Sequence, residues 1–548
     1  MRFEQRIPRF LRPCAAAGLA CCLFASGRPV FASEQNAGAT TPTPQPAPPT
    51  LNQPVTVPAG PQFQLTADEA VRMALENNLG IRAERLSPQV QALILNQARA
   101  NYAPTLISNL VKNSSTTPPE DFLTGSGTSL TNAGLRTNAG LQQLLKWGGG
   151  RYQLTLDGAR NTTSNASSVY NPRLSSNLNA SYTQPLLRNF AIDGLRQQLL
   201  TGQKQQEIVD LQLQQQLTQT ARGVRSAYYD LVGAIGQLQV AQQSLDLANE
   251  SLRNNQRRVE VGTIPPIDIV EAQAEVSRNE EAVIINEAQV RALEDALRTL
   301  VMNPSQPDFW TTRIVPSEQP VLTAQTVDVE AAIRNALEKR MDLAQFRRQM
   351  EQTDISIKYA RNQKLPAVDL TTNYNVIGLG GTQYRFDYDA GVFPAPILGQ
   401  SQRNFNDALR DVFGNNFRTW SVQLNVSYPL GTSIADAALA QSRLQREQQV
   451  TALRAQELQV TAQVRDAGRQ VDTSLKRVEA TLKAREFAER RYEAEQKRMT
   501  VGLSTTFQLF QAQRDLAAAR LAELNAIIAY NRSLVNFEAV QLVPVTGR

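Results

Sequence analysis

The chain contains one long pattern of residues twice. Val261–Thr263 returns 240 residues later as Val501–Leu503, and the stretches that follow the two segments are similar. Further upstream, Ala74–Glu76 returns as Ala336–Glu338 at a shift of 262 residues, because one segment between the two patterns is longer in the first copy. A duplication of this size predicts a fold of two similar halves, so half of the architecture predicts the other half.

Composition favours long helices and argues against enzymatic chemistry. Only 6% of the 548 residues are aromatic, while Ala, Leu, Gln and Arg are abundant, which is typical of long helices rather than a compact mixed core. The chain has no histidine. This removes the usual general base, the usual zinc ligand and every nucleophile that histidine activates. We expect no enzyme activity, no cofactor and no metal site.

The N-terminus is typical of a secretory signal peptide over residues 1–32. Four arginines precede a short apolar stretch, Cys14–Ala25, and small residues at the end of the segment suit cleavage after Ala32. A retained membrane anchor would need about 20 apolar residues, more than this stretch offers. Lipidation at Cys21 or Cys22 is the alternative.

After cleavage the chain would contain no cysteine, because Cys14, Cys21 and Cys22 all lie in the signal peptide. The signal peptide holds five Arg and one Glu, so 56 − 5 = 51 basic and 50 − 1 = 49 acidic residues remain, a net charge of about +2. Nucleic acid is not an expected partner, because binding it needs a concentrated positive face. The proline-rich residues 33–64 predict an extended, unfolded leader.

Four segments alternate between apolar and polar residues with the period of a β-strand. In the clearest, residues 419–429, Trp420, Val422 and Leu424 alternate with polar, uncharged residues. The other three lie near residues 104–113, 175–185 and 366–377. Each half of the chain therefore contributes two strands with one apolar and one polar face.

The longest features are two predicted helix hairpins, residues 191–302 and 432–540. In the first, apolar residues such as Val224, Leu231 and Leu238 recur every seven positions. This period makes helices underwind slightly and pack side by side. At about 1.5 Å per residue, the longer helix of a hairpin spans roughly 100 Å.

The predicted organisation follows from these elements. After the signal peptide and leader come a first repeat, a proline-containing bridge, a second repeat and a short C-terminal tail. Their expected bounds are 65–302, 303–326, 327–540 and 541–548.

The strands have the length of tilted bilayer-spanning strands, about nine to eleven residues. A bilayer does not tolerate open sheet edges, and four strands cannot close a cylinder by themselves. Several copies of the chain must therefore share one barrel. Two copies would give about eight strands and a filled interior, whereas three would give about twelve and leave a lumen.

The chain resembles the TolC family of outer-membrane efflux and secretion ducts over residues 65–540. The resemblance rests on the duplicated halves, the strand endings Gln184–Leu186 and Tyr428–Leu430, the segment Ala227–Asp230, and the two Val-Gly turns. It implies a mainly helical chain with membrane strands: a homotrimer with a shared transmembrane β-barrel in outer-membrane lipid above a long periplasmic helical barrel.

The same resemblance implies the function and the partners. Three copies would form the exit duct of a tripartite efflux pump or a type I secretion system, a passive conduit gated at its periplasmic helix tips. A periplasmic adaptor protein would dock on the duct, and an inner-membrane pump would supply the energy. A periplasmic or surface coiled-coil scaffold without a pore is the alternative, but it predicts no bilayer-compatible strands.

The resemblance also implies a gate at the helix tips, where the family has acids six and nine residues after each turn glycine. The first half keeps them as Asp268 and Glu271, whereas the second half has Gln508 and Gln511. Glutamine would weaken cation binding at the constriction while keeping hydrogen bonding. The same two acids are also expected if they only favour the start of a helix.

Three further expectations concern the same region and one insertion. A clasp between Asp268 and Arg498 is a hypothesis that follows from their opposite charges beside the two turns. The turns Val261–Thr263 and Val501–Leu503 are candidate adaptor-docking points, or simple helix-hairpin turns. Alternation at residues 135–160 predicts an extra hairpin, either in the barrel wall or above the membrane.

Overall fold

The computed structural model describes residues 62–119, 129–318, 320, 327–392, 394–431 and 433–541. The expected signal peptide, residues 1–32, lies outside these residues, as does the expected leader up to residue 61. Residues 319 and 321–326 of the expected bridge and residues 542–548 of the expected tail also lie outside them.

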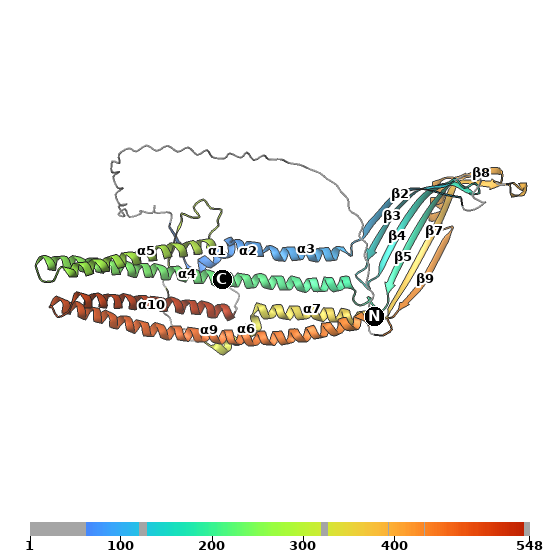
Figure 1. Cartoon of the computed structure of the whole chain (residues 1–548). Coiled ribbons are helices and arrows are strands. Elements are labelled where there is room, and N and C mark those ends of the chain that lie inside the picture. The colour runs from blue at the N-terminus through green and yellow to red at the C-terminus, as the bar shows by residue number, and fades with distance from the viewer. Residues whose placement is uncertain are drawn as a thin grey trace, which may run out of the picture. The chain divides into compact units, whose positions relative to one another are not determined.

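Each half contains one very long helix that returns through a shorter one. In the first half α4 (Gly194–Glu260) has 67 residues and α5 (Ile267–Val301) has 35. In the second half α9 (Ile434–Thr500) also has 67 residues and α10 (Thr506–Gln541) has 36. Figure 1 shows α5 along α4 and α10 along α9. The matched lengths confirm the two repeats predicted from the duplicated sequence.

Shorter helices cover the remainder of the long ones. α3 (Leu86–Ala100) packs on α4, and α7 (Met341–Gln363) packs on both α4 and α9. Near the middle of the long helices, α1 (Ala67–Asn77) contacts α4 and α5, and α6 (Val329–Lys339) contacts α9 and α10. α2 (Leu79–Glu84) connects α1 to α3. The helices α1, α3, α4 and α5 of the first half thus correspond in order to α6, α7, α9 and α10 of the second, while α2 has no counterpart among the described helices.

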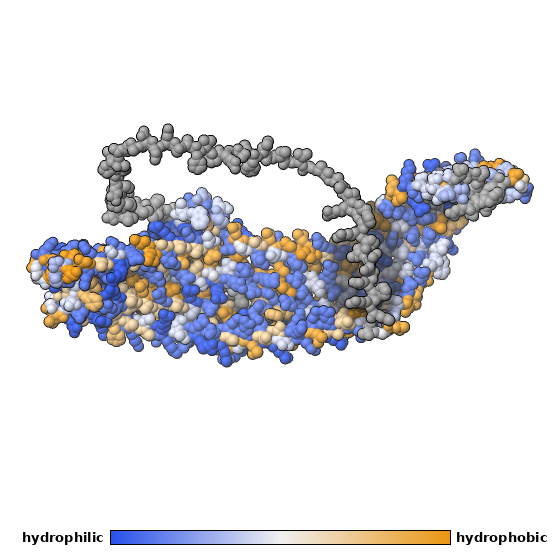
Figure 2. Space-filling view, viewed as in Figure 1, coloured by the Kyte–Doolittle hydropathy of each residue, from blue (hydrophilic) through white to orange (hydrophobic). Residues whose placement is uncertain are grey.

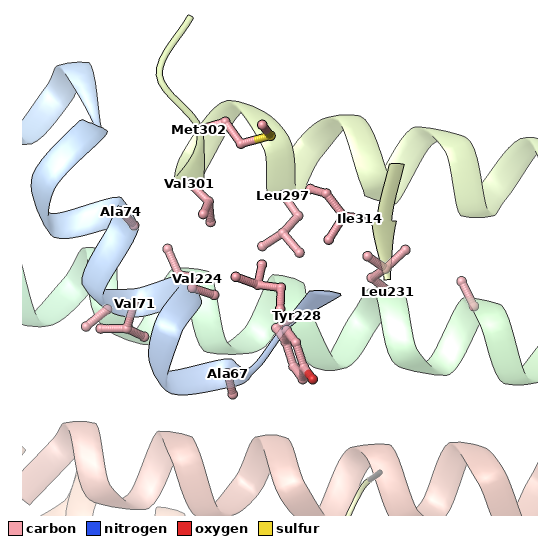
Figure 3. Packing of buried hydrophobic residues seen from close by; sticks show 14 of the residues in the cluster. Ala67, Val71, Ala74, Val224, Tyr228, Leu231, Leu297, Val301, Met302 and Ile314 are labelled. Atoms are coloured by element: carbon pink, nitrogen blue, oxygen red, sulfur yellow. The ribbon is translucent and has the colours of Figure 1, made fainter. Parts of the chain in front are cut away.

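The first hydrophobic core lies where α1 meets α4 and α5. Tyr228, Leu231 and Leu297 are fully buried there, and Figure 3 shows Tyr228 and Leu297 pointing into the space between the helices. The Tyr228 hydroxyl accepts a hydrogen bond from the backbone N–H of Glu318 at 3.2 Å. Burying the ring while pairing its one polar atom avoids the cost of an unsatisfied group.

The second core has the same plan with different side chains. Gly468 stands 240 residues after Tyr228, and Phe537 stands 240 residues after Leu297. A Cβ on Gly468 would lie only 2.8 Å from Val329 Cγ2 and 3.7 Å from Phe537 Cε2. The larger ring of Phe537 and the valine from α6 therefore fill the space that Tyr228 fills in the first half.

Two short strands correct the predicted boundaries of the leader and bridge. β1 (Gln62–Leu65) pairs in parallel with β6 (Arg313–Pro316). Residues 62–64 therefore belong to the folded first half rather than to the leader, because this pairing buries Leu65 in the first core. The start of the predicted bridge also packs there, since Phe309 is buried in the same core.

Within the described ranges, the larger sheet is antiparallel and has seven strands. Its strands are β2 (Thr105–Thr117), β3 (Leu130–Leu144), β4 (Arg151–Thr163), β5 (Tyr170–Pro185), β7 (Ala367–Phe386), β8 (Ile397–Arg403) and β9 (Arg418–Ser427). The order is β2-β3-β4-β5-β7, and both β9 and β8 then pair with the free edge of β7, at different points along it. The extra hairpin that the sequence predicts is β3 and β4, inserted between β2 and β5.

The segment between β7 and β9 carries structure that the sequence did not predict. After β7 come a short 3-10 helix, Tyr388–Ala390, then β8, and then α8 (Phe405–Phe413), which packs on β7 and β5. Gly378 permits this contact, because a Cβ there would lie 1.8 Å from the backbone oxygen of Ala408. None of the helices in the described ranges combines the length and the apolar character needed to cross a membrane.

Candidate functional site at the helix tips

The two tip turns have the same backbone hydrogen bonds. After α4, the N–H of Gly262 donates to the Val259 carbonyl at 2.9 Å and that of Thr263 donates to Arg258 at 2.8 Å. After α9, the N–H of Gly502 donates to Met499 at 3.2 Å and that of Leu503 to Arg498 at 2.9 Å. Both are Schellman motifs, which satisfy carbonyls that a helix end leaves unpaired.

Glycine is required in both turns by backbone geometry alone. Gly262 has φ +73° and Gly502 has φ +77°, in the left-handed region that other residues resist. No atom lies within 4 Å of a Cβ built on either residue. No neighbouring atom therefore excludes a side chain at either position, and only the backbone angle favours glycine.

The tips expose apolar side chains. Val261 is 73% exposed and Leu503 is 78% exposed, and Val501 beside it is also exposed. Ile267 at the start of α5 and Phe507 at the start of α10 extend this surface. Figure 2 shows hydrophobic residues at the end where α4 and α5 meet. Exposed apolar groups gathered at one end of a molecule are typical of a surface that another protein covers.

Asp268 joins the two halves at the tips. Its carboxylate accepts a hydrogen bond from the Thr506 hydroxyl at 3.5 Å, across the boundary between α5 and α10. Its backbone carbonyl accepts a bond from the Asn255 amide at 3.4 Å. Thr506 and Asn255 are both buried. Asp268 therefore bridges α4, α5 and α10 rather than only starting its own helix.

The hypothesis of a clasp between Asp268 and Arg498 is wrong for one chain. Arg498 pairs with Glu495 at 3.5 Å, one turn earlier on its own helix. Asp268 bonds to Thr506 instead. The charges are opposite, but a same-helix acid lies three residues from Arg498, and such pairs need no rearrangement of the backbone.

The remaining gate candidates lie on the first two turns of α5 and α10. Glu271 is exposed. Gln508 accepts bonds from the Ser504 hydroxyl at 3.0 Å and the Thr505 N–H at 3.4 Å, so it closes the start of α10. Gln511 lies one turn further on and accepts a bond from Arg514 at 3.2 Å.

Sequence reasoning missed an ion pair that crosses the halves. Glu275 is buried and pairs with Arg278 of its own helix at 3.0 Å and with Arg514 of α10 at 3.7 Å. Glu275 lies seven residues after Asp268, so the seven-residue period places both on one face of α5. This seven-residue spacing is the sequence signal from which Glu275 could have been predicted as part of the site. No cluster of three metal-binding side chains occurs among the described residues.

Two antiparallel helix pairs with exposed tip turns, attached to a sheet with bilayer-length strands, define a channel-tunnel class of protein. The pattern of the family described as outer membrane efflux protein matches residues 151–301 and 332–540. The chain belongs to the outer membrane efflux protein family, and this confirms the resemblance to TolC. Among curated proteins no significant relative was found.

Solved structures of channels share this fold. A membrane protein from Pseudomonas aeruginosa has a TM-score of 0.62 at 16% identity, covering 88% of this chain and 94% of that chain. The Campylobacter jejuni CmeC outer membrane channel has a TM-score of 0.61 at 14% identity, covering 87% and 85%. The Neisseria gonorrhoeae MtrE outer membrane channel, in its open state, has a TM-score of 0.58 at 17% identity, covering 87% and 88%.

The family and the fold together establish the main function. The chain is an outer-membrane channel-tunnel with a long periplasmic helical extension, and it serves as an exit duct for an efflux pump. Channels of this family are transport proteins rather than enzymes, and they work as homotrimers with adaptor proteins and inner-membrane pumps. The non-pore scaffold, which was the alternative, has no support from these comparisons.

Proposed function

We propose that three copies of this chain form one duct whose periplasmic entrance is built from the two tip turns of each copy. The observation that carries the proposal is the pair of matched turns, each ending a helix of 67 residues and each exposing apolar side chains. A closed ring of such tips would narrow the entrance, while the sheet at the opposite end of the long helices would span the membrane.

The contacts between the two halves at the tips would hold this entrance narrow. Thr506–Asp268 and Arg514–Glu275 both connect α5 to α10. Separating the hairpins breaks both contacts, and an opening motion of this kind is a rigid shift of packed helices. Asp268 and Glu271 would supply the negative charge at the constriction. Gln508 and Gln511 would supply only hydrogen bonds.

Planar-bilayer recordings test the gate. Arg514→Ala removes the cross-half partner of Glu275, so we expect a larger single-channel conductance than in the wild type. Arg278→Ala is the matched control, because it removes only the partner that lies on the same helix. Equal conductance in the wild type and Arg514→Ala would contradict a gating role for this pair.

The tip turns would also receive the adaptor. Val261 and Leu503 are apolar and largely exposed, and covering apolar side chains with a partner is favourable. An inner-membrane pump coupled through that adaptor would supply the energy, as for other channels of this family.

Substitution at one tip position tests docking. Val261→Asp should abolish efflux-dependent resistance in the native host while leaving the amount of channel in the outer membrane unchanged. Val261→Leu keeps an apolar side chain and should retain resistance. If Val261→Asp supports full resistance, the first tip turn is not a docking point.

A further inference from the structure

We infer that each copy of this chain contributes six strands to the transmembrane wall, so that a trimer closes an eighteen-stranded barrel. Four strands per copy would give twelve. The inference rests on the proposed trimer. It concerns β3 and β4, which the sequence alone did not place in the wall or above it.

Pairing is the first observation. Every residue of β2 pairs with β3, from Thr105 with Gln142 to Thr117 with Leu130. β4 pairs along its whole length with β3, and from Arg151 to Asn161 with β5. β2 and β5 therefore do not meet each other. The hairpin is part of the sheet along its full length and cannot rise above it without breaking both neighbouring ladders.

The faces of the strands are the second observation. Following one row of paired residues from β2 to β9 gives Leu106, Leu141, Leu154, Ala180, Tyr374 and Trp420. The next row, on the opposite face, gives Thr105, Gln142, Gln153, Ser181, Asn373 and Ser421. In these two rows one face is apolar and the other is polar and uncharged in all six strands. Charged residues lie in other rows: Arg136 and Asp157 on the polar face, and Arg160 on the face of Leu154. β3 and β4 match the lipid-facing and lumen-facing alternation of their neighbours.

The leucines on the apolar face of the hairpin are exposed in one chain. Leu154 is 44% exposed, and Leu135 and Leu141 are also exposed. A hairpin standing in water would gain nothing from such a face, whereas lipid covers it at no cost. Lipid is therefore the covering that the pattern fits.

Helix α8 supplies the third observation. Gly158 of β4, Ser176 of β5 and Gly378 of β7 form one row of small residues. α8 lies on this row, since a Cβ on Gly158 would be 3.1 Å from Phe405 and a Cβ on Gly378 would meet Ala408. α8 therefore packs mainly on β5 and β7, on the same face of the sheet as Leu154 and Tyr374, and reaches β4 of the inserted hairpin through Phe405.

The two outer edges identify the partner as a second copy of this chain. Among the described residues, β2 pairs only with β3 and β9 pairs only with β7. The outer edges of these strands, which have 13 and 10 residues, are therefore free in one copy. In a bilayer such edges must be paired. β9 of one copy adjoining β2 of the next leaves no free edge after three copies.

The size of the helical part agrees with eighteen strands. Contacts of α3 with α4, α4 with α7 and α7 with α9 place four helices side by side in each copy. Twelve helices spaced about 9 Å apart give a perimeter of about 110 Å. Eighteen strands about 4.8 Å apart and tilted by about 40° also give about 110 Å, whereas twelve such strands give about 75 Å.

The consequence is a wide exit. Barrels of 16–18 strands leave an aqueous channel, and barrel diameter grows roughly linearly with strand number. The eighteen-stranded barrel would therefore be about one and a half times as wide as a twelve-stranded one. The membrane part of the duct would not be narrower than the helical tunnel that feeds it.

Single cysteines in proteoliposomes test the placement of the hairpin. Leu154→Cys and Gln153→Cys probe the two faces of β4, and Val422→Cys and Gln423→Cys probe β9 as the control pair. We expect a membrane-impermeant maleimide to label Leu154→Cys at least tenfold more slowly than Gln153→Cys, as in the β9 pair. Equal, fast labelling of both β4 positions beside a tenfold difference in β9 would overturn the inference. Peptide mass spectrometry separates these sites from Cys14, Cys21 and Cys22.

Single-particle electron microscopy of the detergent-purified channel gives the second readout. We expect a three-fold particle with eighteen strands in its membrane part. A three-fold particle with twelve strands and the hairpin outside the wall would overturn this inference and leave the proposed duct intact. A particle without three-fold symmetry would overturn the proposed duct itself.

Discussion

Two glycines decide how the longest helices end. Gly262 and Gly502 adopt positive φ angles in open space, so the backbone angle is the only constraint on either residue. The sequence predicted these turns, because a glycine that interrupts two matched apolar patterns marks a helix C-terminus.

Gly262→Ala should destabilise the first tip turn by about 1–2 kcal/mol, because alanine resists the left-handed region. The Thr263 amide, which donates to Arg258, should then exchange hydrogen roughly 5- to 30-fold faster. Gly223→Ala is the control. That glycine lies inside α4 in open space, so alanine there should stabilise the helix by about 0.5–1 kcal/mol. An unchanged exchange rate at Thr263 would contradict the account of the turn.

Gly468 tests the packing of the second core. Alanine there would bring a Cβ to 2.8 Å from Val329, and overpacking of this kind costs about 1–3 kcal/mol. We expect a lower melting temperature in detergent for Gly468→Ala. The double variant Gly468→Ala with Val329→Ala should lose less than the sum of the two single changes. A stabilised Gly468→Ala would show that helix propensity outweighs the contact.

Side-chain partners at the tips were the least predictable residues. Opposite charges beside the two matched turns suggested that Arg498 pairs with Asp268, but the orientation of each side chain around its helix decides which groups meet. Arg498 forms an ion pair with Glu495, and Asp268 accepts a hydrogen bond from Thr506 of α10. Proximity to a turn therefore did not predict how these side chains pair.

At the scale of elements, α7 is tied to α9 by one partly buried carboxylate. Asp342 pairs with Arg340 at 2.7 Å and accepts a hydrogen bond from Gln456 of α9 at 3.0 Å. Burial alone would raise the pKa of Asp342, but the hydrogen bonds and charge of Arg340 outweigh it and lower that pKa below 3.8. The folded chain therefore favours the charged form.

Asp342→Asn should destabilise the channel by about 1–3 kcal/mol at neutral pH. Because the folded pKa of Asp342 is lowered, its contribution is complete above the ordinary value of 3.8 and is lost as the pH falls through the lowered value. The melting-temperature difference from the wild type should thus shrink in acid below that value. Asp354→Asn is the control, since its pair with Arg446 is nearly half exposed and should matter less. A pH-independent difference for Asp342→Asn would contradict this account.

The period of the apolar residues predicted most elements. Seven-residue spacing predicted the long helices, and two-residue alternation predicted the strands, because burial of one face imposes these periods. The same alternation did not predict whether β3 and β4 lie in the barrel wall or above the membrane, since a strand has the same pattern in both places. The strand β8 and the helix α8 were missed because their segment lies between two strand patterns and is held by contacts with β7 that are distant in sequence.

At the scale of the whole molecule, α4 and α10 bring the two halves together through small residues. A Cβ on Gly233 would lie 3.3 Å from Ile528, and one on Gly236 would lie 2.7 Å from Leu524. The duplication predicted the two halves but not this interface, because both copies of a repeat carry similar patterns and neither encodes how they meet.

Gly236→Val should weaken that interface, because the added side chain requires Leu524 to move, at a cost of about 1–3 kcal/mol. We expect a lower melting temperature with the fold of each half retained by circular dichroism. Gly236→Ala should be milder, since the far end of the leucine side chain can give way. Two variants with the melting temperature of the wild type would contradict close packing of the halves.

The central claim is that sheets too small to close by themselves become one conduit when three copies combine them. Native mass spectrometry of the detergent-purified protein tests this most directly, because it counts chains in each particle. The account predicts three chains per particle, with no stable single chain released on mild activation. A single chain per particle that stays in solution without detergent would contradict it.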